Sequence, residues 1–195
     1  MNIENEITVE VNISLNELIK LVENNGFILK KKTNMNDIYM INKSDKNNDF
    51  LLMLNKCILL RSIKEQDNEF NMITYKYKEY NENKEIIKQT KTNCIVEDIK
   101  QAQILFEQLD YEKLIEIDDQ MLIYANDTDE IAIQNVNNKH LYIEIEDDCH
   151  YANRHYKSLD EMKEVISKYK IPIKNNNYFA KKAEVELIET YNEGM

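Results

Sequence analysis

Charged residues two positions apart in strand-like segments are the first candidates for chemistry in this chain. Glu144 and Glu146 have this spacing, and so do Lys76 and Lys78. Residues two apart in a β-strand point to the same side of the sheet, so each pair puts two like charges on one face. Two carboxylates on one face can bind Mg²⁺, which prefers oxygen ligands. The alternative is a sheet face exposed to water, where charged side chains usually lie.

Arg61 differs from these pairs because it directly follows the apolar segment 57–60. A guanidinium beside a buried segment must have a hydrogen-bonding partner, since burying an unpaired charge is very costly. We therefore expect a buried partner for Arg61.

The cysteines and histidines suggest only a minor alternative. Asp147, Asp148, Cys149 and His150, with His155, are residue types that bind transition metals. They are few and fall in a loop-like region, so a loop is the favoured interpretation. The chain has 3 widely spaced cysteines and no C-x-x-C pair, which excludes a disulfide framework and a cysteine-based zinc site.

Composition excludes several other classes of protein. With 2 glycines, the chain cannot form the glycine-rich loops of dinucleotide-binding proteins, P-loop proteins or kinases. A net charge of −11 predicts no binding to nucleic acid. The N-terminus is acidic and the apolar runs are short, so we expect a cytoplasmic protein with no leader and no membrane span.

The elements that would position these residues can be predicted from periodicity. Two capping boxes, Ser14–Glu17 and Ser158–Glu161, begin helices that end at Gly26 and before Pro172. Apolar stripes predict two more helices, at 98–109 and 178–191. Alternation predicts strands at residues 6–13, 35–42, 50–63, 71–79, 85–96, 113–125, 130–136 and 139–146.

These elements predict an α+β fold with an antiparallel sheet of eight strands. Each half of the sheet-forming region has the order strand–helix–strand–strand–strand. The pattern permits two arrangements: a sheet with one face exposed to water and helices on the other, or a closed or strongly curved barrel with a polar lumen and helices outside.

The local sequences and their order resemble the CYTH superfamily, which includes class IV adenylyl cyclases and thiamine or inorganic triphosphatases. The resemblance covers residues 5–147, with a C-terminal helical part at 156–192, and implies a single domain over 1–195. The matching segments are Glu6-Ile-Thr8-Val-Glu10 (family E-x-E-x-K), Leu60-Arg61-Ser-Ile63 (L-R-x-R), Ile73-Thr74-Tyr75-Lys76 (L-T-Y-K), Lys88-Gln-Thr90-Lys-Thr92 (R-x-E-x-E) and Ile133-Gln134-Asn-Val136 followed by Glu144-Ile145-Glu146 (L-D-x-V…E-I-E).

The resemblance implies a triphosphate tunnel, which is an eight-stranded barrel whose lumen holds Mg²⁺ or Mn²⁺ and an organic or inorganic polyphosphate. Carried over residue by residue, it gives two expected sets that line one cavity. The metal ligands would be Glu6, Glu144 and Glu146, and the phosphate-binding residues would be Arg61, Lys76 and Lys88.

The departures from the family pattern imply weakened or lost catalysis. Thr8 stands in place of a carboxylate, Glu10 in place of a lysine and Ile63 in place of an arginine. Thr90, Thr92 and Gln134 replace further acidic residues, and Ile115–Met121 has neither of the lysine and arginine that the family strand carries. Three functions therefore stay open: a metal-dependent triphosphate hydrolase or adenylyl cyclase, a non-catalytic ligand-binding protein of the same fold, and an unrelated α+β interaction module.

Overall fold

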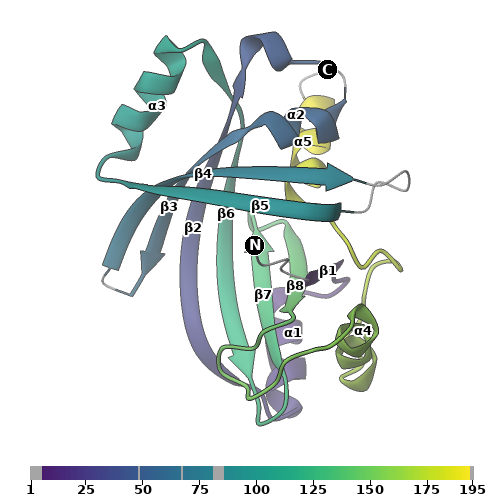
Figure 1. Ribbon diagram of the computed structural model, residues 1–195. Coiled ribbons are helices and arrows are strands. Elements are labelled where there is room, and N and C mark those ends of the chain that lie inside the picture. Colours follow the sequence, from purple (N-terminus) through teal and green to yellow (C-terminus); the bar gives the residue numbers. More distant parts are fainter. Residues whose placement is uncertain (1–5, 48, 67, 81–85, 194–195) are drawn as a thin grey trace. The chain divides into compact units, whose positions relative to one another are not determined.

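The computed structural model describes residues 6–47, 49–66, 68–80 and 86–193 (Figure 1). Within them the chain forms eight strands and five α-helices, which confirms the α+β class. The strands are β1 (Glu6–Glu10), β2 (Ile28–Asn42), β3 (Ile58–Glu65), β4 (Asn68–Tyr80), β5 (Ile86–Val96), β6 (Tyr111–Ala125), β7 (Glu130–Val136) and β8 (His140–Glu146). The α-helices are α1 (Leu15–Asn24), α2 (Phe50–Lys56), α3 (Ile99–Gln108), α4 (Leu159–Lys168) and α5 (Lys182–Glu193). None of the helices described has the length and apolar composition needed to cross a membrane.

The eight strands form one sheet in the order β1-β8-β7-β6-β2-β3-β4-β5. The pairs β1–β8, β8–β7, β7–β6, β2–β3, β3–β4 and β4–β5 are all antiparallel. This confirms the predicted antiparallel sheet. The order ends at β1 and β5, and no ladder joins these two strands within the described residues, so the predicted closure into a barrel is not confirmed.

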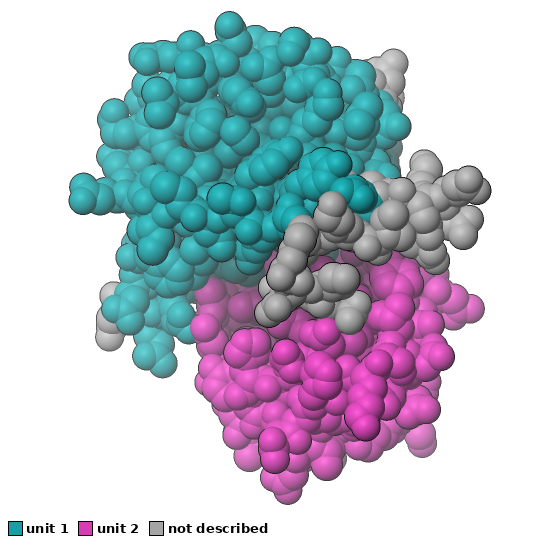
Figure 2. Space-filling view, viewed as in Figure 1, with its two compact units in different colours: residues 1–3, 34–118, 181–195 teal, residues 4–33, 119–180 magenta. Residues whose placement is uncertain are grey.

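The chain divides into two compact units (Figure 2). Unit 1 contains residues 1–3, 34–118 and 181–195, and unit 2 contains residues 4–33 and 119–180. Strands β2 and β6 each contribute residues to both units. Each unit is therefore assembled from segments that lie far apart in the chain.

The apolar core of unit 2 lies on one face of its strands. Ile7 and Val9 of β1 and Ile143 of β8 are fully buried there, and Ile145 is nearly so. Burying an aliphatic side chain contributes about 2 kcal/mol, so this face is the main source of stability in the unit. Helices α1 and α4 cover it with the buried side chains of Leu18, Val22, Met162, Val165 and Ile166.

The ends of α1 and α4 follow the predicted local signals. Ser14 and Glu17 form a complete capping box, in which each side chain bonds the other residue's backbone N–H. Ser158 caps α4 by accepting a hydrogen bond from the backbone N–H of Glu161. Gly26 follows α1 with a φ of +82°, a left-handed conformation that glycine adopts without a Cβ penalty.

Unit 1 has its own smaller core, beneath α3. Ala102 of α3 packs against Met40 of β2 and Leu60 of β3, both fully buried. Ile99 and Phe106, at helical spacing on the same stripe of α3, extend this contact. The helix therefore covers the face of β2 and β3 that carries Met40 and Leu60.

The predicted single strand over residues 50–63 is wrong. Residues 50–56 form α2, and β3 begins only at Ile58. Asp49 caps this helix by accepting a hydrogen bond at 3.0 Å from the backbone N–H of Leu52. A short apolar run is equally compatible with a buried strand and a buried helix, and here the cap decides between them.

A nine-residue segment, which we call the C-terminal strap (residues 172–180), lies along the outer edge of β1. Four backbone hydrogen bonds of 2.8–2.9 Å join them: Asn12 N to Pro172 O, Lys174 N to Glu10 O, Thr8 N to Tyr178 O, and Ala180 N to Thr8 O. Edge strands expose unpaired backbone groups, and the strap satisfies those of β1. The last helix consequently begins at Lys182 rather than at 178 as predicted.

Asp129, in the β6–β7 connection, is a buried carboxylate that holds α4 and the segment before it to the sheet. Its side chain has no exposed area, and it accepts hydrogen bonds from Arg154 at 2.7 Å and Lys168 at 2.7 Å. Tyr156, Tyr169 and Thr128 donate three more, at 2.9, 2.6 and 2.9 Å. Burial opposes ionisation, but the hydrogen bonds outweigh it and lower the pKa of Asp129 to about 2.

Candidate functional site

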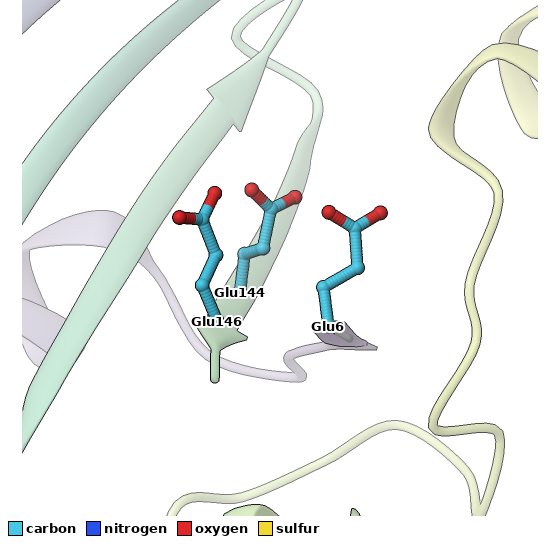
Figure 3. A group of neighbouring side chains, drawn as sticks. All are labelled: Glu6, Glu144 and Glu146. Atoms are coloured by element: carbon cyan, nitrogen blue, oxygen red, sulfur yellow. The ribbon is translucent and has the colours of Figure 1, made fainter. Parts of the chain in front are cut away.

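Three carboxylates meet on β1 and β8 of unit 2 (Figure 3). The register pairs Glu6 with Glu146 and Thr8 with Glu144. Paired residues share a face of the sheet, as do residues two apart, so the three glutamates lie on one face. One carboxylate oxygen from each lies within 4.8 Å of the other two. The sequence predicted these three as metal ligands; the structure brings them together, and the metal-binding role itself stays a prediction.

The apolar core fixes the direction of these side chains. Ile7 lies next to Glu6 in β1, and Ile145 lies between Glu144 and Glu146 in β8; both isoleucines are no more than 1% exposed. A register slip of one residue would move the glutamates into the core and the isoleucines out of it. The hydrophobic pattern therefore holds the carboxylates on the face that α1 and α4 do not cover.

The three oxygens fit the requirements of a hard divalent cation. Mg²⁺ binds oxygen at about 2.1 Å, so two ligands of one ion lie at most about 4 Å apart. The observed separations of up to 4.8 Å need only small side-chain movements to reach this geometry. Three ionised carboxylates at such distances repel by about 3 kcal/mol per pair at an effective dielectric constant of about 20, before solvent screening reduces it. A bound cation would relieve this repulsion.

Glu10 lies on the same face of β1 as Glu6 and is held by two basic side chains. Its Oε1 atom is 2.8 Å from Lys174 Nζ and 3.1 Å from His140 Nδ1. Lys174 belongs to the C-terminal strap and His140 to β8. Sequence reasoning found Glu10 but missed both partners, because Lys174 is 164 positions away in the chain.

Arg61 has the buried partner that its sequence environment predicted. Its Nε and one terminal nitrogen each donate a hydrogen bond of 2.6 Å to Asp37, one to each carboxylate oxygen. Asp37 is 5% exposed. This two-point geometry fixes the guanidinium on β3, and it neutralises the charge that a phosphate would otherwise meet.

The register of β4 and β5 bears on the lysines predicted beside Arg61. Lys76 of β4 pairs with Lys91 of β5, while Lys88 pairs with Glu79. Lys88 and Lys91 are three residues apart, so strand alternation places them on opposite faces. The lysine that shares a face with Lys76 is therefore Lys91, which is exposed. The side chain of Lys88 itself lies outside the described part of the structure.

The six predicted site residues are divided between the two units. The three glutamates belong to unit 2, whereas Arg61, Lys76 and Lys88 belong to unit 1. Their convergence on one cavity stays a prediction.

The minor alternative, a transition-metal site at residues 147–155, gains no support. Within this segment His155 Nδ1 lies 2.6 Å from Asp148, and His150 lies 3.8 Å from Glu130 of β7. Among the described residues, the glutamate cluster on β1 and β8 is the group of potential ligands close enough together to share a metal ion.

Comparison with known proteins identifies the fold. No family model matches the chain, and no curated protein matches it by sequence. Solved structures do match. The PH1819 protein of Pyrococcus horikoshii is 16% identical over 97% of this chain and 99% of that protein, with a TM-score of 0.67.

Two further solved structures have names that indicate an activity. HpAC1 of Hippeastrum, a candidate adenylyl cyclase described as having a dominant triphosphatase activity, is 12% identical over 98% of this chain and 96% of its own, with a TM-score of 0.60. A candidate adenylate cyclase of Vibrio parahaemolyticus is 10% identical over 95% and 97%, with a TM-score of 0.55. Identities this low support the fold and leave the activity open. The resemblance seen in the sequence is confirmed at this level: the chain has a CYTH-like fold.

Proposed function

We propose that this protein binds an organic or inorganic polyphosphate together with Mg²⁺ or Mn²⁺, in a tunnel formed by its eight strands, and that its turnover is weak or absent. The observation that carries the proposal is the group Glu6, Glu144 and Glu146 on the face left uncovered by α1 and α4. The likeness to HpAC1 supports a triphosphate as the ligand.

Each set of residues has its own role in the proposal. The three glutamates hold the metal, which when bound neutralises charge on the phosphate oxygens. Arg61, Lys76 and Lys91 donate hydrogen bonds to the non-bridging oxygens, with Lys91 taking the place first expected for Lys88. In this proposal, side chains bind the phosphate oxygens, as backbone amides do in glycine-rich loops. Such a site needs no glycine-rich loop, which agrees with a chain that has 2 glycines.

Three local features support weak or absent catalysis. Thr8 and Glu10 occupy the two positions of β1 that follow Glu6 on its face, and they supply neither a further metal ligand nor a lysine. Arg61 is engaged by Asp37, which reduces its attraction for an anion. The alternative of a non-catalytic ligand-binding protein therefore differs from the main proposal only in turnover.

Metal binding is tested by calorimetric titration of the protein with Mn²⁺. We expect Glu144→Gln to weaken binding at least tenfold, because it removes one of three charged ligands. Glu164→Gln, at an exposed position of α4, is the matched control and should bind like the native protein. Equal affinity in all three proteins would remove the carboxylate cluster from the proposal.

Ligand identity is tested by thermal shift with tripolyphosphate, ATP and thiamine triphosphate, each with and without metal, because a ligand that binds the native state must raise Tm. Phosphate-release and cyclisation assays on the same samples separate the catalytic from the non-catalytic alternative. The lysines provide a matched pair: Lys91→Gln should weaken binding, whereas Lys88→Gln should not. The reverse result would show that the other face of β4 and β5 meets the ligand.

A further inference from the structure

Unit 2 contains a pocket that is distinct from the carboxylate cluster. Its volume is about 540 Å³, within the range of small-molecule sites. Three segments line it: the connection from β1 to α1, the hairpin between β7 and β8, and the C-terminal strap. We call it the Lys174 pocket; its polar lining residues are Glu10, Asn12, Ser14, Asn135, Asn138, Lys139, His140 and Lys174.

The charge of this lining is opposite to that of the chain. The whole protein has 36 acidic and 25 basic residues. The pocket contains two lysines and a histidine against one carboxylate, and the amides of three asparagines add further donors. A concave site rich in donors favours an anion over a cation.

Lys174 is the best-placed of these donors because its position is fixed at two points. Its backbone N–H donates to Glu10 O at 2.8 Å, and its ammonium donates to Glu10 Oε1 at 2.8 Å. An ammonium has three N–H donors, and the bond to Glu10 uses one of them, which leaves capacity for a ligand. The side chain is 51% exposed, which keeps it accessible from the pocket. A donor already held in place loses less conformational entropy on binding.

Glu10 sets how strongly an anion can compete for this lysine. The same carboxylate oxygen contacts both Lys174 and His140, and the side chains of Glu10 and His140 are only 13% and 10% exposed. An entering oxyanion must share the ammonium with Glu10 and is repelled by its charge.

We propose that the Lys174 pocket binds a small oxyanion of the phosphate class, with Lys174 as its main cation and Glu10 as a competitor that limits its affinity. This site lies at the far end of β1 from Glu6: the backbones of Glu6 and Glu10 are four residue steps, or about 13 Å, apart. Binding here needs no metal and none of the three carboxylates, so it goes beyond the proposed function.

The test is titration with inorganic phosphate and with tripolyphosphate in the presence of a chelator, followed by calorimetry and by backbone amide shifts. We expect saturable binding, with the largest shifts at residues 138–141 and 174. Lys174→Gln should weaken binding at least tenfold and Glu10→Gln should tighten it severalfold. Lys157→Gln, at an exposed lysine outside the pocket, should leave it unchanged.

The two variants are expected to change the affinity for phosphate in opposite directions. This difference distinguishes a ligand site from an ion pair with a structural role only. If Glu10 and Lys174 serve only to fasten the strap, both variants lower stability and neither changes binding, which overturns the proposal. Absence of native binding overturns it as well. Should Lys174→Gln fail to fold, Lys174→Arg keeps the charge and must retain binding. Metal titration without phosphate tests the carboxylate cluster separately, so the two sites can fail independently.

Discussion

Two buried carboxylates, Asp37 and Asp129, show how single residues hold this protein together. Each accepts hydrogen bonds from an arginine, Arg61 in the first case and Arg154 in the second. A buried ion pair is weak evidence for net stability, but removing one partner leaves the other charge uncompensated. The loss on mutation is therefore large even where the pair itself contributes little.

Replacing Asp129 with asparagine should lower the free energy of unfolding by about 3–5 kcal/mol at neutral pH. Because the folded-state pKa of Asp129 is lowered from 3.8 to about 2, its ionisation contributes about 2 kcal/mol of that stability. This part is fully present above about pH 4 and is lost as pH falls through about 2. Urea denaturation of native and Asp129→Asn proteins at pH 7, 5, 4 and 3 measures the free energy of unfolding of each. The difference between the two proteins should become smaller at pH 4 and pH 3.

Asp127→Asn is the matched control for this experiment. Asp127 lies in the same turn but is exposed. Its replacement should change stability by less than about 0.5 kcal/mol at every pH. If the loss of unfolding free energy in Asp129→Asn were the same at every pH, the shape of Asp129, and not its charge, would be what stabilises the protein.

The sequence predicted residues whose signal is local and missed those that depend on distant segments. The glutamates of β1 and β8 follow from alternation against isoleucines, and the need of Arg61 for a partner follows from its apolar neighbours. The identity of that partner, Asp37, and the pairing of Glu10 with Lys174 depend on tertiary structure. Lys88 was expected from the family resemblance, and only the register of β5 with β4 shows that Lys91 is the residue opposite Lys76.

Among the elements, α2 shows most clearly where local signals conflict. Its sequence, Phe-Leu-Leu-Met-Leu-Asn-Lys, has no alternation and would suit a buried strand. Met53 is its one buried residue, and Phe50 packs edge-to-face against Tyr191 of α5. Capping by Asp49 adds to this limited packing in favouring the helix.

Asp49→Ala should accordingly destabilise the protein by about 1 kcal/mol, whereas Asp49→Asn should cost a few tenths at most, because asparagine caps equally well. Hydrogen exchange at Leu52, whose amide bonds the Asp49 side chain, reports the change directly. Faster exchange at Leu52 in the alanine variant alone is the expected result. Equal exchange in both variants would mean that tertiary contacts hold α2.

For the molecule as a whole, the division into two units raises the question of cooperativity. Within the described residues, the chain passes between units after residues 33, 118 and 180, and the first two of these passages fall within β2 and β6. A strand that continues from one unit into the other transmits unfolding between them. We therefore expect one cooperative transition, in agreement with the predicted single domain.

Two cysteines, one in each unit, provide the probes. Cys57 is buried in unit 1, where burial raises the pKa of its thiol to about 12, and Cys149 is half-buried in unit 2, where burial also raises its pKa. Both thiols should become reactive toward a maleimide at the same urea concentration. Cys94→Ser removes the exposed third thiol from the background. Two separate midpoints would establish two independently folding units.

The C-terminal strap has a consequence for how this chain is made. Strand β1 is synthesised well before both of its neighbours, which are β8, at residues 140–146, and the strap, at 172–180. At 5–20 residues per second, translation takes on the order of ten seconds or more to pass from β1 to the strap. During that interval β1 has at least one open edge, and its Ile-Thr-Val core is available to other chains. A chain that ends before residue 172 lacks the strap, so it should aggregate more readily than the chain that contains it.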